Sequence, residues 1–144
     1  MYVSLVEESR RRDLKILKFE VEADAMRLYP DGAGRTVVIR PDAYLHLVVG
    51  DVELHCFLEI DRATENPRRI ADKCQAYRAY ELTDIEYEQH GVVPGVMFIV
   101  PDEQPQRAQV IARVIAAQPD DARDLYRVTM EAGAITALSI PTIS

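Results

Sequence analysis

The chain has 144 residues, 48% of them hydrophobic and 28% charged, and its formal net charge is −7 at pH 7. This length and balance indicate a single soluble globular domain with a core of ordinary size. No apolar run approaches the ~20 residues that span a bilayer, and two cysteines are too few for a disulfide framework. The acidic net charge argues against a module that binds nucleic acid over its whole surface.

The first segment, "MYVSLVEESRRRDLK", lacks the basic-then-apolar order of a signal peptide, so a cytoplasmic location is expected. Residues 3–12 suit a helix, whereas residues 13–25 carry both a helical and an alternating apolar stripe. We expect a helix to about Arg12 and then a strand through about Val21.

Gly50-Asp51 lies between two runs rich in Val, Leu, Tyr and Phe, which predicts a hairpin with strands at about 36–49 and 52–61. A two-residue loop makes the numbers of opposing residues sum to 101. One face is then wholly apolar: Ala43, Leu45, Leu47, Val49, Val52, Leu54, Cys56, Leu58 and Ile60. The other face carries the polar residues: Arg40, Asp42, Tyr44, His46, Glu53, His55, Phe57, Glu59 and Asp61.

Asn66 and Pro67 form a favoured N-cap pair for a long helix that runs to about His90. "GVMFIV" (95–100) has the pattern of a strand buried on both faces, residues 105–118 that of a second helix, and "DLYRVTM" that of a last strand; residues 131–138 suit a short helix. The order α-β-β-β-α-β-α-β predicts an α/β domain over residues 1–144, with a mixed central sheet and a hairpin core flanked by helices.

The register places Asp42 opposite Glu59, with Cβ atoms ~5 Å apart, where like charges destabilise a ladder. A divalent cation such as Mg²⁺ would compensate, because it prefers carboxylate oxygens. Neutralisation by Arg40, Arg62 or another Arg would also compensate, and the pairing alone leaves both interpretations open.

His46 opposite His55 raises a transition-metal site, or an unrelated enzyme that uses these two residues. Such a site needs a third close ligand. Cross-strand packing of two half-exposed rings is the simpler interpretation.

Pro41-Asp42, followed after the hairpin by Glu59-Ile60-Asp61, resembles the motif of the PD-(D/E)xK nuclease superfamily. The strings "RPDAYLHL", "FLEIDRATENPRRIADKCQAYRAY", "GVMFIVPDEQPQRAQVI" and "DLYRVTM" resemble one branch more closely, the replication-relaxation family. The resemblance covers roughly Lys15 to Met130. It implies a restriction-endonuclease-like fold and a role in the replication or relaxation of plasmids and integrative elements.

The resemblance also implies a metal site. Asp42, Glu59 and the Ile60 carbonyl would hold Mg²⁺, with Mn²⁺ as a substitute, and a Lys would assist the attacking water. The motif's Lys position is Asp61 here, an acid that the register pairs with Arg40. Lys73, on the following helix, is the candidate replacement, and Gln75 resembles a Gln often seen beside it.

Two hypotheses follow. In the first, the nuclease-like domain acts in plasmid or mobile-element replication or mobilisation after losing catalysis, which Asp61 and the lack of room for the family's N-terminal winged helix-turn-helix favour. In the alternative, it is an active Mg²⁺-dependent DNA endonuclease or nickase using Asp42, Glu59 and Lys73. Arg62, Arg68 and Arg69, around the helix N-terminus, would hold the DNA backbone. The expected partners are DNA, proteins of a replication or mobilisation complex and a second copy of the chain, with no membrane.

Overall fold

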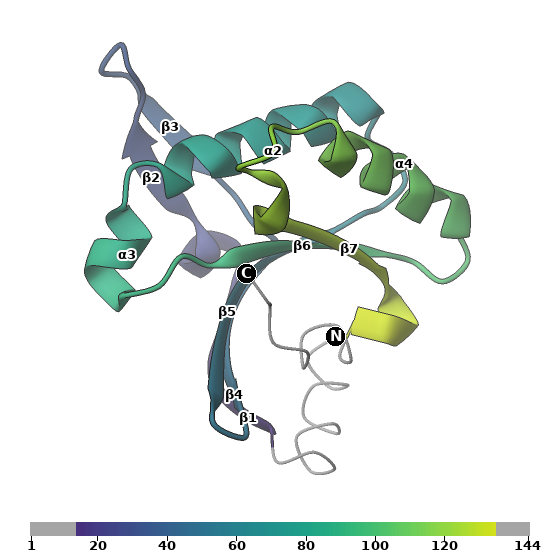
Figure 1. Ribbon diagram of the computed structural model, residues 1–144, viewed down its shortest axis with the longest axis horizontal. Coiled ribbons are helices and arrows are strands. Elements are labelled where there is room, and N and C mark those ends of the chain that lie inside the picture. The colour runs from purple at the N-terminus through teal and green to yellow at the C-terminus, as the bar shows by residue number, and fades with distance from the viewer. Residues whose placement is uncertain (1–13, 135–144) are drawn as a thin grey trace.

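A five-stranded mixed sheet forms the centre of the molecule in the computed structural model, which describes residues 14–134 (Figure 1). Its spatial order is β1 (Leu14–Val21), β4 (Ala43–Val49), β5 (Val52–Ile60), β6 (Gly95–Val100) and β7 (Tyr126–Met130). The first three strands are antiparallel neighbours, and β6 and β7 continue the sheet in parallel with β5. This confirms the predicted α/β class with a mixed sheet.

Two helices, α2 (Pro67–Glu81) and α4 (Pro105–Ala116), lie across the same face of this sheet (Figure 1). Their buried residues pack with aromatic residues of the strands in one core cluster, which includes Ile70, Cys74, Tyr77, Ile111, Phe57 and Phe98. A second cluster on the opposite face includes Leu45, Leu47, Leu58, Met97 and Ile99. The sheet is therefore apolar on both sides at its centre.

The hairpin register is confirmed, since Val49 pairs with Val52, His46 with His55 and Ala43 with Leu58. Gly50 turns the chain with φ +59°, a conformation that glycine adopts without steric cost. The predicted apolar face is the one that holds the second cluster. The other face is not a solvated surface near its base, because Tyr44, Phe57 and Glu59 are all buried there.

The prediction of one continuous helix from Pro67 to about His90 is wrong at its C-terminal end. α2 stops at Glu81, and α3 (Ile85–His90) starts after Asp84, whose φ of 61° is left-handed. The Thr83 hydroxyl donates to the Tyr80 carbonyl at 2.6 Å, a local bond that competes with helix continuation. The break turns Glu86 inward, where it is 4% exposed.

The strand predicted over 36–49 is also divided. β3 (Thr36–Ile39) pairs instead with β2 (Arg27–Pro30), a strand that the sequence pattern did not indicate, and the two form a separate arm (Figure 1). Pro41, which has no N–H to donate, lies at the break. Short 3₁₀ turns complete the fold: η1 (Glu22–Ala25), η2 (Arg123–Leu125) and η3 (Glu131–Gly133).

The expected strand ending at Val21 is confirmed. The helix expected over 3–12 lies outside the described residues. Of the helix expected over 131–138, the structure describes only the beginning, where η3 covers 131–133. Within residues 14–134, no helix is long and apolar enough to cross a membrane.

Candidate functional site

Asp42 lies immediately before β4, and its carboxylate is held by β5. Oδ2 accepts the Ile60 backbone N–H at 2.7 Å, and Oδ1 lies 3.4 Å from both terminal nitrogens of Arg62. The Asp42 N–H in turn donates to the Leu58 carbonyl at 3.0 Å. The carboxylate thus extends the ladder as a side-chain acceptor, and Arg62 is the neutralising Arg that the sequence left open.

Glu59 is 5% exposed beneath α2. Its Oε1 accepts the Tyr77 hydroxyl at 2.6 Å, and its Oε2 lies 3.3 Å from the Lys73 ammonium, which also donates to Glu65 at 2.7 Å. Lys73 and Tyr77, four residues apart, share the inner face of the helix, and both reach Glu59 from there.

Burial and neighbouring charges together set the ionisation of Glu59 and Lys73. Burial raises the pKa of Glu59; the Tyr77 hydrogen bond and Lys73 oppose the shift, and the Asp42 charge adds to it. Burial would lower the pKa of Lys73, but hydrogen bonds and charges from Glu65 and Glu59 raise it above its ordinary value. Lys73 is therefore a fixed cation between two acids rather than a proton acceptor.

Asp61 does not pair with Arg40 as the register suggested. Its two oxygens accept Nε and Nη2 of Arg107 at 2.8 and 2.7 Å, and this bond lowers the pKa of Asp61. The Asp61 N–H donates to the Ile99 carbonyl at 2.8 Å, so the residue continues β5 alongside β6 and lies within reach of α4. The acid at the motif's Lys position is thus one half of a buried bidentate ion pair.

The remaining predicted residues are exposed, and one of them, Arg69, lines a cleft next to this group. A cleft of about 330 Å³ is lined by Val38, Ile39, Arg40, Glu59, Arg69, Lys73, Ala76 and Tyr77. The side chains of Arg62 and Arg69 are 66% and 72% exposed, and Arg68 is exposed as well. Gln75 is exposed on α2, away from the face that carries Lys73 and Tyr77, so it is not brought to Glu59.

The arrangement does not suit the Mg²⁺ ion that the resemblance implies. All four carboxylate oxygens of Asp42 and Glu59 already face protein donors, two of them cationic side chains. Among the described residues, Asp42 and Glu59 join no group of three His, Cys, Asp or Glu side chains whose ligand atoms converge. Mg²⁺ demands near-octahedral oxygen ligands at ~2.1 Å, which would require displacing Lys73 and Arg62.

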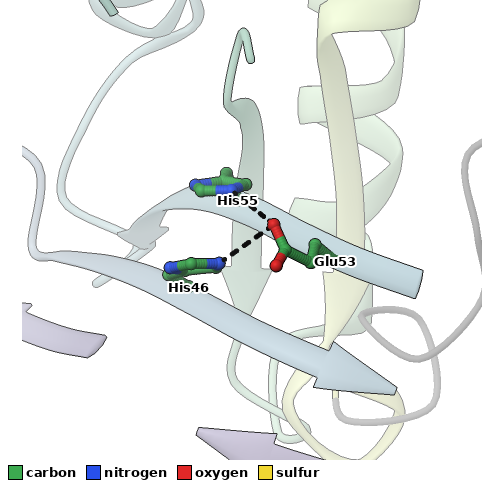
Figure 2. A group of neighbouring side chains, drawn as sticks. All are labelled: His46, Glu53 and His55. Carbon is green, nitrogen blue, oxygen red and sulfur yellow. Dashed lines mark ion pairs between the residues drawn. The ribbon is translucent and has the colours of Figure 1, made fainter. Parts of the chain in front are cut away.

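The tip of the hairpin carries a second polar group. The rings of His46 and His55 stack with centroids 3.9 Å apart and planes 18° from parallel, which confirms the predicted cross-strand packing. Glu53 Oε2 lies 3.6 Å from His46 Nε2 and 3.9 Å from His55 Nε2 (Figure 2). The Tyr44 hydroxyl lies 2.7 Å from His55 Nδ1.

A third polar group joins the β2–β3 arm to the rest of the fold. The Arg27 guanidinium bonds Glu86 at 2.5 Å and Glu20 at 3.3 Å, and its carbon lies 4.8 Å from the centre of the Tyr44 ring. The Tyr80 hydroxyl donates to Glu86 at 2.7 Å. Glu20 thus belongs to a structural network.

Sequence reasoning missed several of these partners. Glu53 is two residues from His55 in one strand, so it lies on the same face, and that spacing could have marked it as a third ligand. Tyr77 stands in the string that carries the family resemblance. Arg107 is separated from Asp61 by 46 positions, and no local pattern links them.

Comparison with known proteins supports the resemblance. The family model described as replication-relaxation matches residues 1–96. A search of curated proteins gave no match, and a search of solved structures gave none either.

Proposed function

Because the chain belongs to the replication-relaxation family, we propose that it acts in the replication or mobilisation of plasmid or mobile-element DNA, as a PD-(D/E)xK nuclease-like domain that contacts DNA without cutting it. One observation carries the proposal: the acids that would ligate the metal are satisfied by protein donors. Asp42 is held by Ile60 and Arg62, and Glu59 by Tyr77 and Lys73.

The rim of the cleft supports the DNA-contacting part. Arg40 and Arg69 line the cleft and are exposed, and Arg68, next to Arg69 in the first turn of α2, is exposed as well. The ion pairs of Arg62 and Arg69 with acids are long and solvated, so replacing the acid by a phosphate costs little free energy. The start of α2 adds backbone N–H groups that favour anions, although the Asn66 side chain already accepts the Arg69 N–H at 2.9 Å.

Two measurements on the full chain test the proposal. In the first, plasmid nicking is followed in Mg²⁺ and in Mn²⁺ for the wild type and Asp42→Ala, while metal binding is titrated in parallel. We expect neither nicking nor binding that depends on Asp42. Nicking by the wild type that Asp42→Ala abolishes would instead establish the active endonuclease.

The second measurement compares duplex DNA binding of the Arg68→Ala/Arg69→Ala double variant with that of Arg113→Ala/Arg123→Ala, which removes two exposed Arg elsewhere. The first pair should weaken binding and reduce the slope of log K against log salt by about 2, and the second pair should not. If the wild type binds no DNA, the DNA-contacting role is wrong and the domain must act through protein partners.

A further inference from the structure

The tip of the hairpin brings together three side chains with metal-binding atoms. The ligand atoms of His46, Glu53 and His55 all lie within 4.8 Å of one another, and among the described residues no other such group occurs. Both imidazole Nε2 atoms lie within 4 Å of the same carboxylate oxygen, Oε2 of Glu53 (Figure 2). We propose that this trio is a site for a borderline divalent cation, Zn²⁺ foremost, separate from the Asp42–Glu59 group.

The donor set suits Zn²⁺ rather than Mg²⁺. Two imidazoles and one carboxylate form a ligand set found in zinc enzymes, in which a water completes the tetrahedron. Bond lengths of 2.0–2.2 Å place tetrahedral ligand atoms ~3.3 Å apart. The observed separations from Glu53 Oε2, 3.6 and 3.9 Å, exceed that value by a few tenths of an ångström.

His46 provides an independent sign of a missing partner. Its Nε2 is buried and has no hydrogen-bond partner in the described part of the chain, since Glu53 Oε2 lies beyond hydrogen-bonding distance. Buried polar atoms normally have a partner, so this one calls for an explanation. A cation between His46 and Glu53 would satisfy it.

His55 already has one of its two ring nitrogens engaged by the core. When its Nδ1–H donates to the Tyr44 hydroxyl, 2.7 Å away, Nε2 keeps its lone pair and faces Glu53. Metal-bound imidazoles characteristically make such an outer hydrogen bond, which fixes the ring and its tautomer. Tyr44 is 2% exposed in the core, so the support is rigid.

Binding of the ion requires a small, low-energy rotation of the two imidazole rings. The stacked rings must rotate about χ2 until each Nε2 lone pair points at the ion, and this torsion has a broad energy profile in His. Glu53 is the adjustable ligand, because its side chain is 59% exposed. Glu53 and His55 also line a cleft of about 280 Å³ beside β5.

The test uses the full chain without a polyhistidine tag, stripped with EDTA and titrated with Zn²⁺ alone at neutral pH. Calorimetry should show one ion per chain, bound at least tenfold more weakly by His46→Gln and by Glu53→Gln. His90→Gln, which removes the remaining histidine of the chain, and Asp42→Ala should bind as the wild type does.

Ring ¹⁵N resonances provide a second readout that does not depend on variants. Zn²⁺ should shift those of His46 and His55 and leave those of His90 in place. Absence of wild-type binding, binding unchanged in both ligand variants, or loss of binding in Asp42→Ala would each overturn the proposal. If His46→Gln fails to fold, the exposed Glu53→Gln variant and the resonances decide the matter.

Discussion

The base and the tip of the β4–β5 hairpin present polar side chains on the same face of the sheet, yet their surroundings differ. At the base, α2 lies across Glu59, and both oxygens of that carboxylate face donors of the protein. The tip extends beyond the helices (Figure 1), and there a buried imidazole nitrogen of His46 has no partner in the described chain. Beneath the helix the Glu59 carboxylate is satisfied by protein donors, whereas at the tip the His46 nitrogen remains available to a ligand.

The largest effect should come from breaking the ion pair beside the base. Arg107→Ala leaves the carboxylate of Asp61, whose side chain is 3% exposed, buried without its ion-pair partner. We expect the free energy of unfolding to fall by about 3 kcal/mol in urea titrations. Arg113→Ala, an exposed site on the same helix, should change it by less than about 0.5 kcal/mol. Equal effects of the two substitutions would mean that Asp61 is not held as described.

Removing the cation above Glu59 should have an intermediate effect. Lys73→Met leaves the buried carboxylate with Tyr77 as its remaining donor and should cost about 1–2 kcal/mol, since the Lys side chain is partly exposed. In a Glu59→Gln background the same substitution should cost much less. Additive losses would show that Lys73 and Glu59 do not interact.

Two acids of the base should impose opposite pH dependences on stability. The pKa of Asp61 is lowered, so its contribution is present above its unfolded value of 3.8 and is lost as pH falls through the folded pKa. The pKa of Glu59 is raised, so stability declines as pH rises from its unfolded value of 4.5 through the folded pKa.

Urea titrations across pH separate these contributions. Glu59→Gln should flatten the decline above pH 4.5, and Asp61→Asn should reduce the loss at low pH. An unchanged profile in Glu59→Gln would remove the argument that burial governs this carboxylate.

The smallest effect is expected at the tip. Glu53 is exposed, and its contacts with the two imidazoles are longer than hydrogen bonds. Glu53→Gln should therefore change the metal-free stability by less than about 0.5 kcal/mol in the same titrations. A loss of stability comparable to that of Lys73→Met would mean that the polar groups of the tip and of the base stabilise the fold equally.

The sequence predicted what depends on local pattern. Register followed from the two-residue turn, the start of α2 from Asn66 and Pro67, and β6 from its apolar run. The division of the long helix did not follow, because the break near Asp84 is stabilised by distant partners of Glu86 such as Arg27. Likewise Asp42, Glu59 and Lys73 were identified as a group, but Arg107 comes from a helix that only the tertiary fold brings near.

The mixed sheet has a consequence for the order in which the chain gains structure. β4 and β5 are joined by two residues, whereas the parallel neighbours β5 and β6 are separated by α2 and α3, and β6 and β7 by α4. Pairing distant segments requires closing a long loop first, which slows their association. We therefore expect the hairpin to acquire its register while the ribosome is still synthesising the later segments. β6 would then pair with the edge of β5, and β7 with β6.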